Sequence, residues 1–234
     1  MPRRINRVTD QAPPQSLSPR ADAAYDLILD LILDCTISPG ESVSERGLAT
    51  QYDLGIASAR SALSRLASEG LVTAIPRVGY LVQPITLRGV EAFFETWAII
   101  GPEFNRLALA RLTEKHRRRI AAIPELPETA PTREVIDRAE ALFEILASAV
   151  DNPILVDIYR RLQRDLRRLF SFTFRGTPGL HFPSLDVSEI GTGMSADEFA
   201  EASKLYIAEV GQNTMRLLLR DSSLADVPLT FSSN

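Results

Sequence analysis

The feature that most constrains the fold of this chain is the succession of short patterns between residues 25 and 82. An apolar helical pattern runs from Tyr25 to Leu33 and is followed by a turn and a short helical segment around Leu48. A second helical segment, from Ala57 to Ser68, ends at the stop signal Glu69-Gly70. Three short helices are therefore predicted in close succession.

A small β-hairpin follows these helices. Residues 71–74 and 80–82 form two short apolar runs on either side of the turn Pro76-Arg77-Val78-Gly79. Three helices and a hairpin in this order predict a winged helix-turn-helix. In such a module one helix enters the major groove, and the hairpin tip lies along the DNA backbone or in the minor groove.

Composition and length allow one large domain or two modest ones. The chain has 234 residues, is 45% hydrophobic and has a mean hydropathy of −0.01, as expected for a globular protein. It shows no apolar run of roughly 18 residues and no leader pattern, so a cytoplasmic protein without a membrane segment is expected. The lone Cys35 cannot form an internal disulfide, and a buried, inert thiol is favoured over a reactive one.

The charge balance argues mildly against nucleic-acid binding. The net charge is −4, and residues 18–83 carry five arginines against eight acidic residues. Phosphate contacts supply much of DNA affinity, so a basic surface would be expected. However, Asp22, Asp26, Asp30 and Asp34 recur every four residues and lie on one ridge of the first helix, which can face away from DNA.

The domain organisation follows from changes in pattern along the chain. Residues 1–19 are polar and predict a disordered tail, with a minor-groove arm carrying Arg3, Arg4 and Arg7 as the alternative. Residues 20–84 form the predicted winged helix-turn-helix, and residues 87–222 a predicted antiparallel bundle of helices. The expected fold class is therefore mainly α with a small β-hairpin wing.

Within the bundle, helical periodicity and capping signals predict the individual helices. A kink is expected at Gly101-Pro102, a helix start with a cap at Asp151 or Asn152, and a capping box at Ser195–Glu198. The predicted buried stripe of the helix after Pro153 consists of Leu155, Ile158, Leu162, Leu166 and Leu169. Residues 175–194 form a long loop of the kind that often carries function.

Several motifs resemble one known family of regulators. Ser44-Glu45-Arg46, Arg60-Ser61-Ala62-Leu63, Glu69-Gly70-Leu71-Val72 and Gly79-Tyr80 in the first domain, with Phe143 and Asn152-Pro153 in the second, are similar to the GntR family of bacterial transcription regulators. The helical second domain resembles the effector domain of its FCD subfamily. This resemblance implies a DNA-binding protein that is not an enzyme.

The resemblance also implies DNA contacts. In the family the recognition helix typically starts Ser-Arg-Thr-Pro-Val-Arg, whereas this chain has Gly55-Ile56-Ala57-Ser58-Ala59-Arg60, so only the final arginine matches. An arginine there suits a bidentate contact to guanine, and Ile56 can offer only an apolar contact, for example to a thymine methyl group. The candidate DNA-binding residues are Arg46, Ile56, Ala57, Ser58, Arg60, Ser61, Arg65, Arg77, Gly79 and Tyr80.

The effector domain departs from the family's metal site. Family members commonly hold a divalent metal with an acid and three histidines, beginning Asp-x-x-Phe-His, where this chain has Glu140-Ala141-Leu142-Phe143-Glu144. Glu140 and Glu144 share one helix face and could point at one pocket, with a solvated acidic ridge as the alternative. Because the chain holds only His116 and His181, we expect no metal and no cofactor.

Two other features could contact an effector. Trp97 at a pocket wall would favour an apolar or aromatic ligand, although core packing is the favoured role for a lone tryptophan. Arg160, Arg164 and Arg167 could clamp an anion or could form a solvated face. An organic acid or an aromatic metabolite is the expected effector.

Two hypotheses about function remain open from the sequence. The first is a homodimeric, sequence-specific regulator of transcription that binds a palindromic operator in double-stranded DNA and responds to a small-molecule effector. The second is a ligand-binding or protein-interaction module in which DNA recognition has degraded, as Ile56 and the acidic first domain would suggest. A metal-dependent enzyme is disfavoured, since the sequence offers no Ser-His-acid group, phosphate loop or cysteine pair.

Overall fold

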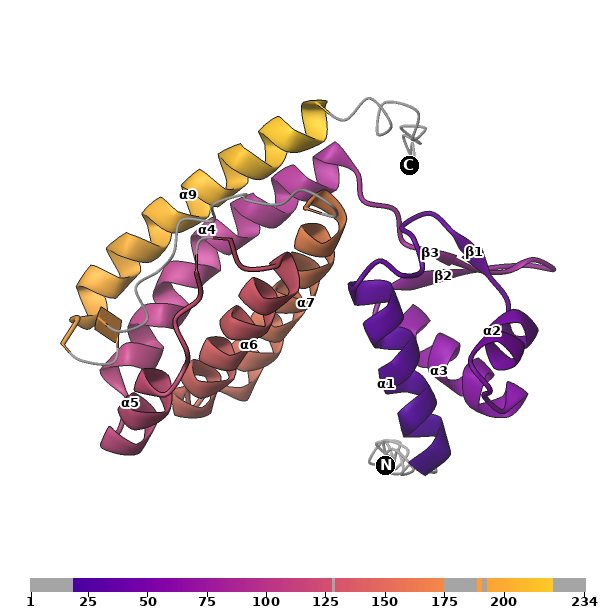
Figure 1. The fold of residues 1–234 in the computed structure, drawn as a ribbon, viewed down its shortest axis with the longest axis horizontal. Coiled ribbons are helices and arrows are strands. Elements are labelled where there is room, and N and C mark those ends of the chain that lie inside the picture. Colours follow the sequence, from indigo (N-terminus) through magenta and orange to yellow (C-terminus); the bar gives the residue numbers. More distant parts are fainter. Residues whose placement is uncertain (1–18, 128, 175–188, 191–192, 221–234) are drawn as a thin grey trace, which may run out of the picture. The chain divides into compact units, whose positions relative to one another are not determined.

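The computed structural model describes residues 19–127, 129–174, 189–190 and 193–220. It divides into two compact units, Met1–Asp30 with Ser42–Val82 and Leu31–Glu41 with Gln83–Asn234, called here the winged domain and the helical domain. The first contains three helices and a small antiparallel sheet, and the second is helical (Figure 1). The predicted fold class is confirmed. The predicted disordered tail falls on residues 1–18, which lie outside the described residues, apart from its last residue, Pro19.

Three helices make up most of the winged domain: α1 (Pro19–Leu33), α2 (Glu45–Gln51) and α3 (Ile56–Ser68). α1 begins six residues before the predicted Tyr25, because the alanines that precede it are strong helix formers and two of them are buried. Ser44 caps α2 by accepting a hydrogen bond from the Gly47 amide at 3.0 Å. α3 buries Ala59, Ala62, Leu63 and Leu66, so its opposite face is left exposed.

The sheet has strand order β1-β3-β2, with both pairings antiparallel. Its strands are β1 (Ser42–Val43), β2 (Val72–Ile75) and β3 (Gly79–Val82). The predicted hairpin is confirmed to within one residue, and β2, β3 and their turn are the wing. β1 was not predicted, since two residues carry no readable alternation.

In the helical domain, α4 (Leu87–Ala110) lies between α9 (Ala196–Arg220) and the pair α6 (Thr132–Ala149) and α7 (Pro153–Thr173), as Figure 1 shows. The short α5 (Glu114–Ala121) packs against α6. α4 continues through Gly101-Pro102, where a kink had been predicted.

The predicted cap and capping box are found where the sequence placed them. Asn152, one of the two candidates, caps α7 by accepting a hydrogen bond from the Leu155 amide at 3.1 Å. The Ser195 hydroxyl accepts from the Glu198 amide at 3.2 Å, and the Glu198 carboxylate accepts from the Ser195 amide at 2.8 Å.

The prediction of the buried stripe of α7 is partly wrong. Leu162, Leu166 and Leu169 are buried as expected. Ile158, however, is 41% exposed, and the buried residue at that turn is Tyr159, which is 4% exposed. The first half of α7 is thus turned by one residue relative to the predicted stripe, which places a phenol inside the bundle.

The acidic ridge of α1 and the lone cysteine were also predicted from the sequence. Asp22, Asp26 and Asp30 are exposed, as a solvated ridge requires, whereas Asp34 lies beyond the end of α1 and is only partly exposed. Cys35 is buried, and its thiol donates a hydrogen bond to the Arg168 carbonyl at 3.4 Å. None of the helices in the described ranges has the length and apolar character needed to cross a membrane.

We expect Gly79→Ala to destabilise the wing more than Gly70→Ala. Both glycines have positive φ, +130° at Gly79 and +79° at Gly70, so alanine is strained at either position. Only at Gly79 would the added Cβ overlap the Val43 carbonyl oxygen, because β1 passes directly beside it. Urea denaturation should show a loss of about 1 kcal/mol for Gly70→Ala and more than about 2 kcal/mol for Gly79→Ala. Equal losses would contradict this account.

Candidate DNA-binding face and helical-domain cavity

Arg60 stands on the exposed side of α3 and is held in place by an acid. Its side chain is 66% exposed, and its Nε lies 3.0 and 2.9 Å from the two carboxylate oxygens of Glu45. Glu45 is the first residue of α2, so the pair ties the two helices together. The hydrogen bond and negative charge of Glu45 raise the pKa of Arg60, which keeps its charge at any physiological pH.

The other candidate DNA-binding residues are arranged around Arg60 to different degrees. Ile56 and Ala57 are exposed at the start of the same helix, while Ser58 and Ser61 are half-buried. Tyr80 of β3 is close enough to affect Arg60 electrostatically. Arg46 on α2 is exposed, and Arg77 is exposed at the wing turn with a φ of +67°; Gly79 follows it as the first residue of β3.

Arg65 does not share this exposed face. Its guanidinium carbon lies 3.6 Å from the ring centroid of Tyr25, and its nitrogens lie 3.6 Å from Asp22 and 3.3 Å from Glu69. It follows Arg60 by five positions, which turns it about 140° around the helix axis. Arg65 therefore joins α3 to α1 through Tyr25 and Asp22, and a DNA contact by Arg65 stays a prediction.

A cavity of about 70 Å³ lies inside the helical domain, between α4, α6, α7 and α9. All four helices contribute to its wall, and most of its lining residues are buried, whereas Ala139 is exposed and Gln163 and Tyr206 are partly buried, so the cavity reaches toward the surface. It is lined by Trp97, Asn105, Ala139, Leu142, Phe143, Leu146, Tyr159, Gln163, Leu166, Phe199, Ser203, Tyr206 and Ile207.

Stacked rings and a short polar network form the wall. The ring of Tyr159 stacks on Phe104 at a centroid distance of 3.9 Å and on Phe143 at 5.2 Å. Trp97 donates its indole N–H to the Tyr159 hydroxyl at 3.4 Å. Asn105 donates to Ser203 Oγ at 2.8 Å, and that hydroxyl donates in turn to the Phe199 carbonyl at 2.6 Å.

Of the residues predicted to bind an effector, the structure brings only Trp97 to this cavity. Glu140 and Glu144 follow the lining residues Ala139 and Phe143 by one position each, about 100° around α6. Glu144 is exposed and lies 3.7 Å from Arg160, and Glu140 lies 3.7 Å from Arg167. Burial raises the pKa of Glu140, while Arg167 and Arg133 act in the opposite direction. Neither carboxylate lines this cavity, and a role for either of them at an effector site stays a prediction.

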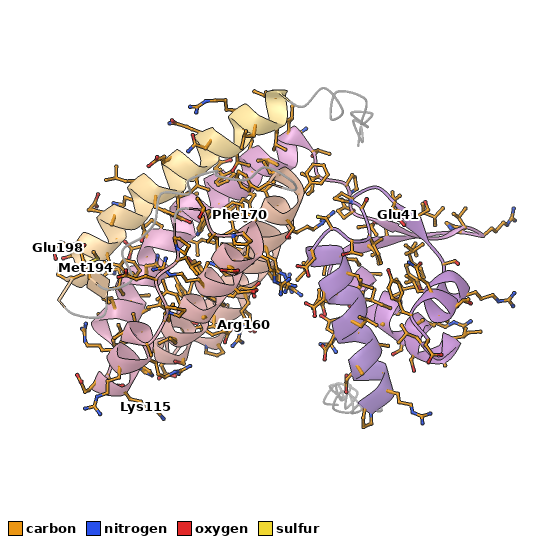
Figure 2. The ribbon with its side chains drawn as sticks, in the orientation of Figure 1. Glu41, Lys115, Arg160, Phe170, Met194 and Glu198 are labelled. Carbon is orange, nitrogen blue, oxygen red and sulfur yellow. The ribbon has the colours of Figure 1, made fainter. Side chains whose placement is uncertain are left out.

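The three arginines of α7 show the same offset. Arg160, Arg164 and Arg167 each follow a cavity-lining residue (Tyr159, Gln163 or Leu166) by one position. Arg160, labelled in Figure 2, is half exposed and pairs with acids at the surface. Arg167 is buried, and its Nη2 lies 2.8 Å from Asp34. None of the three arginines lines this cavity, and an anion clamp formed by them stays a prediction.

Sequence reasoning missed most of the residues that form the cavity. Asn105 and Ser203 are polar residues on otherwise apolar helix faces, and such residues signal either a buried network or a ligand site. Gly101 is a second signal: a Cβ there would lie 2.8 Å from Trp97 and 2.9 Å from Ile207, so the glycine makes room for the indole and α9. These residues are far apart in the sequence, so only the fold brings them together.

The fold and the two candidate sites define a class of two-domain protein, in which a winged helix-turn-helix domain is joined to a helical domain with a cavity. Residues 20–82 match the model of the bacterial regulatory proteins of the gntR family, and residues 92–186 match that of the FCD domain. The chain therefore belongs to the GntR family of bacterial regulatory proteins, in the group that carries an FCD domain.

Individual relatives agree with this assignment. The chain is 30% identical over 91 residues to an uncharacterised HTH-type transcriptional regulator in the TAR-I ttuE-ttuC' intergenic region of Agrobacterium vitis. That match covers 38% of this chain and spans about half of the relative, 53% of its length.

Solved structures share the fold at low identity. E. coli McbR/YncC has a TM-score of 0.68 at 15% identity over 88% of this chain and 100% of its own. A putative GntR regulator from Rhodococcus sp. RHA1 has a TM-score of 0.57 at 15% identity, over 87% of this chain and 99% of its own.

We expect Gly101→Ala to destabilise the helical domain and to alter the fluorescence of Trp97, the chain's single tryptophan. Alanine gains up to about 1 kcal/mol of helix propensity, but overlap with Trp97 and Ile207 should cost about 1–3 kcal/mol. The control Gly89→Ala, in the first turn of α4, meets only the Thr86 hydroxyl and should leave the emission spectrum unchanged. Chemical denaturation and emission spectra test both statements; an unshifted Gly101→Ala spectrum would refute the tight contact.

Proposed function

We propose that this protein is a homodimeric, sequence-specific transcription regulator whose affinity for its operator changes when a small effector binds in the helical-domain cavity. The observation that carries the DNA-binding part is the exposed, acid-held guanidinium of Arg60 on the free face of α3. A charged group held on a rigid helix reads a base edge with little loss of side-chain freedom. Because a bacterial operator lies in the cytoplasm, this function would place the protein there.

Four of the candidate residues have a stated role in this docking. Arg60 would donate two hydrogen bonds to a guanine, and Ile56, exposed one turn earlier, would contact a thymine methyl group. Arg46 and Arg77 would contact phosphates, which position the module without reading the sequence. The degraded-recognition alternative is less well supported, since α3 still presents an exposed arginine on its free face.

Dimerisation is proposed on the outer surface of α4 and α9. A groove there is lined by Phe94, Ala98, Ala208 and Met215, among others, and Leu205 of α9 is 73% exposed. Apolar surface of this kind marks an interaction site. A second copy of the chain is the occupant we propose, because one winged domain reads only a half-site and a palindromic operator requires a two-fold partner.

The effector part of the proposal rests on the cavity. It is lined by four helices, combines aromatic walls with several hydrogen-bonding groups, and takes most of its lining residues from the segment matched by the FCD model. Such pockets are the usual form of small-molecule sites. A ligand that fits one arrangement of the helices better than another would shift the population of DNA-competent dimers.

We expect Arg60→Ala to weaken binding to a duplex selected from random sequences. Loss of a bidentate base contact should lower affinity by about 1–3 kcal/mol, roughly five- to 150-fold, and relax preference at one base pair. Arg216→Ala removes the same charge from exposed α9 and serves as the control. Fluorescence anisotropy at a fixed salt concentration measures both. If the two variants bind alike, Arg60 does not dock as proposed.

The dimer surface is tested by Ala208→Glu. Ala208 is exposed in the groove, so the fold should tolerate glutamate, while a partner packed there would bury an unpaired charge. Ala92→Glu, exposed on α4 outside the groove, is the matched control. Light scattering should show a monomer for Ala208→Glu and a dimer for the control. A dimeric Ala208→Glu protein would move the interface elsewhere.

A further inference from the structure

We propose that the helical-domain cavity accepts a small uncharged aromatic compound bearing a hydroxyl, carbonyl or amide group, and that it does so without a metal ion or a charged anchor. This inference rests on the proposed function, which places the effector in the same cavity. It narrows the sequence-based expectation, in which organic acids and aromatic metabolites stood side by side.

The chemistry of the wall carries the inference. None of the residues that line the cavity is an aspartate, glutamate, lysine, arginine or histidine. A carboxylate placed there would lose its hydration without gaining a counter-charge, and burial of an unpaired ion is strongly unfavourable. An uncharged ring avoids that loss and can stack beside Phe143 and Tyr159, which already stack on each other.

The groups that can orient such a ring are phenols, an indole and amides. Tyr206 lines the cavity and is partly buried, and its hydroxyl is a group that can donate to or accept from a ligand. Burial raises the pKa of both Tyr159 and Tyr206, so neither phenol carries a charge near neutral pH. The wall therefore stays neutral in every relevant protonation state.

One cation lies close enough to need separate consideration. Arg138 of α6 acts electrostatically on Tyr206, but it is not among the lining residues and its Nε donates to the Pro124 carbonyl at 3.1 Å. An acidic ligand would have to recruit Arg138 from this contact. The variant Arg138→Gln therefore separates an anion site from a neutral one.

A metal site of the family's kind does not fit these residues. The wall offers neither imidazole nor carboxylate donors, and across the described ranges no three His, Cys, Asp or Glu side chains group closely enough to hold an ion. His116 is occupied at the start of α5, where its Nδ1 accepts from the Thr113 amide at 3.2 Å. His181 lies outside the described residues.

Size limits the ligand further. A cavity of about 150 Å³ holds benzene, whereas this one measures about 70 Å³. A single-ring compound therefore requires a wall residue to move. Tyr206 is the best placed to do so, because it is only partly buried and lies on α9 with an edge-on contact to Trp97 at 6.1 Å.

The experiment compares charge-matched pairs of single-ring probes on the purified full-length protein. Benzamide and benzyl alcohol are tested against benzoate and benzylamine, using the melting temperature and the fluorescence of Trp97, the only tryptophan. We expect the neutral probes to bind at least tenfold more tightly than the charged ones, with no change on adding EDTA or zinc. Arg138→Gln should leave their binding unchanged.

Tyr206→Phe should weaken benzamide about fivefold, through loss of one hydrogen bond, and Tyr52→Phe in the winged domain is the control with the same chemical change. Tighter binding of benzoate, loss of that binding in Arg138→Gln, a requirement for zinc, or no binding by any probe would each overturn the inference. A different outcome would contradict the proposed function: neutral probes would bind and change the fluorescence of Trp97, but the affinity of the protein for the selected DNA duplex would stay the same.

Discussion

The contact on which the helical domain depends is the one between Trp97 and Gly101 of α4 and Ile207 of α9. A side chain at position 101 would overlap both neighbours, so the missing Cβ sets how closely α9 approaches α4. The same indole donates to the buried hydroxyl of Tyr159, which links this helix pair to α7. α4 lies between α9 and the α6–α7 pair (Figure 1), so Gly101 permits the close approach of α9 beside Trp97, which itself lines the cavity.

In the winged domain, the arrangement of charges leaves the cation Arg60 exposed although the domain is acidic overall. The net charge of the segment would repel DNA if it were spread evenly, but three of its aspartates lie along the exposed ridge of α1. Arg65, which might have added to the basic face, is held against Tyr25 and Asp22 of α1. What remains on the free face of α3 is Arg60, steadied by Glu45. Specificity through few, well-placed contacts suits such a surface better than affinity through total charge.

The difference between what the sequence revealed and what it did not has a physical basis. The winged domain is built from local signals, such as the cap at Ser44 and the turn before Gly79, so α3 and the hairpin were predicted to within one residue, whereas the start of α1 and the two-residue β1 were not. In the bundle, leucine and isoleucine occur on more than one face of α7, and an error of one residue turns a helix by about 100°. That single step separates Tyr159 from Arg160 and Phe143 from Glu144. The sequence therefore predicted charged side chains at the effector site, whereas the residues that line the cavity are uncharged.

The uncharged lining of the cavity also limits how an effector could act on DNA binding. A charged ligand can shift an equilibrium through long-range electrostatics, but an uncharged one has only shape, burial and a few hydrogen bonds. It must therefore fit one packing of α4, α6, α7 and α9 better than another, and the shift it causes cannot exceed that difference in affinity. The cavity is smaller than a single ring needs, so the packing that binds such a ring differs from the one described here. That mismatch is what gives an uncharged ligand a preference between two states.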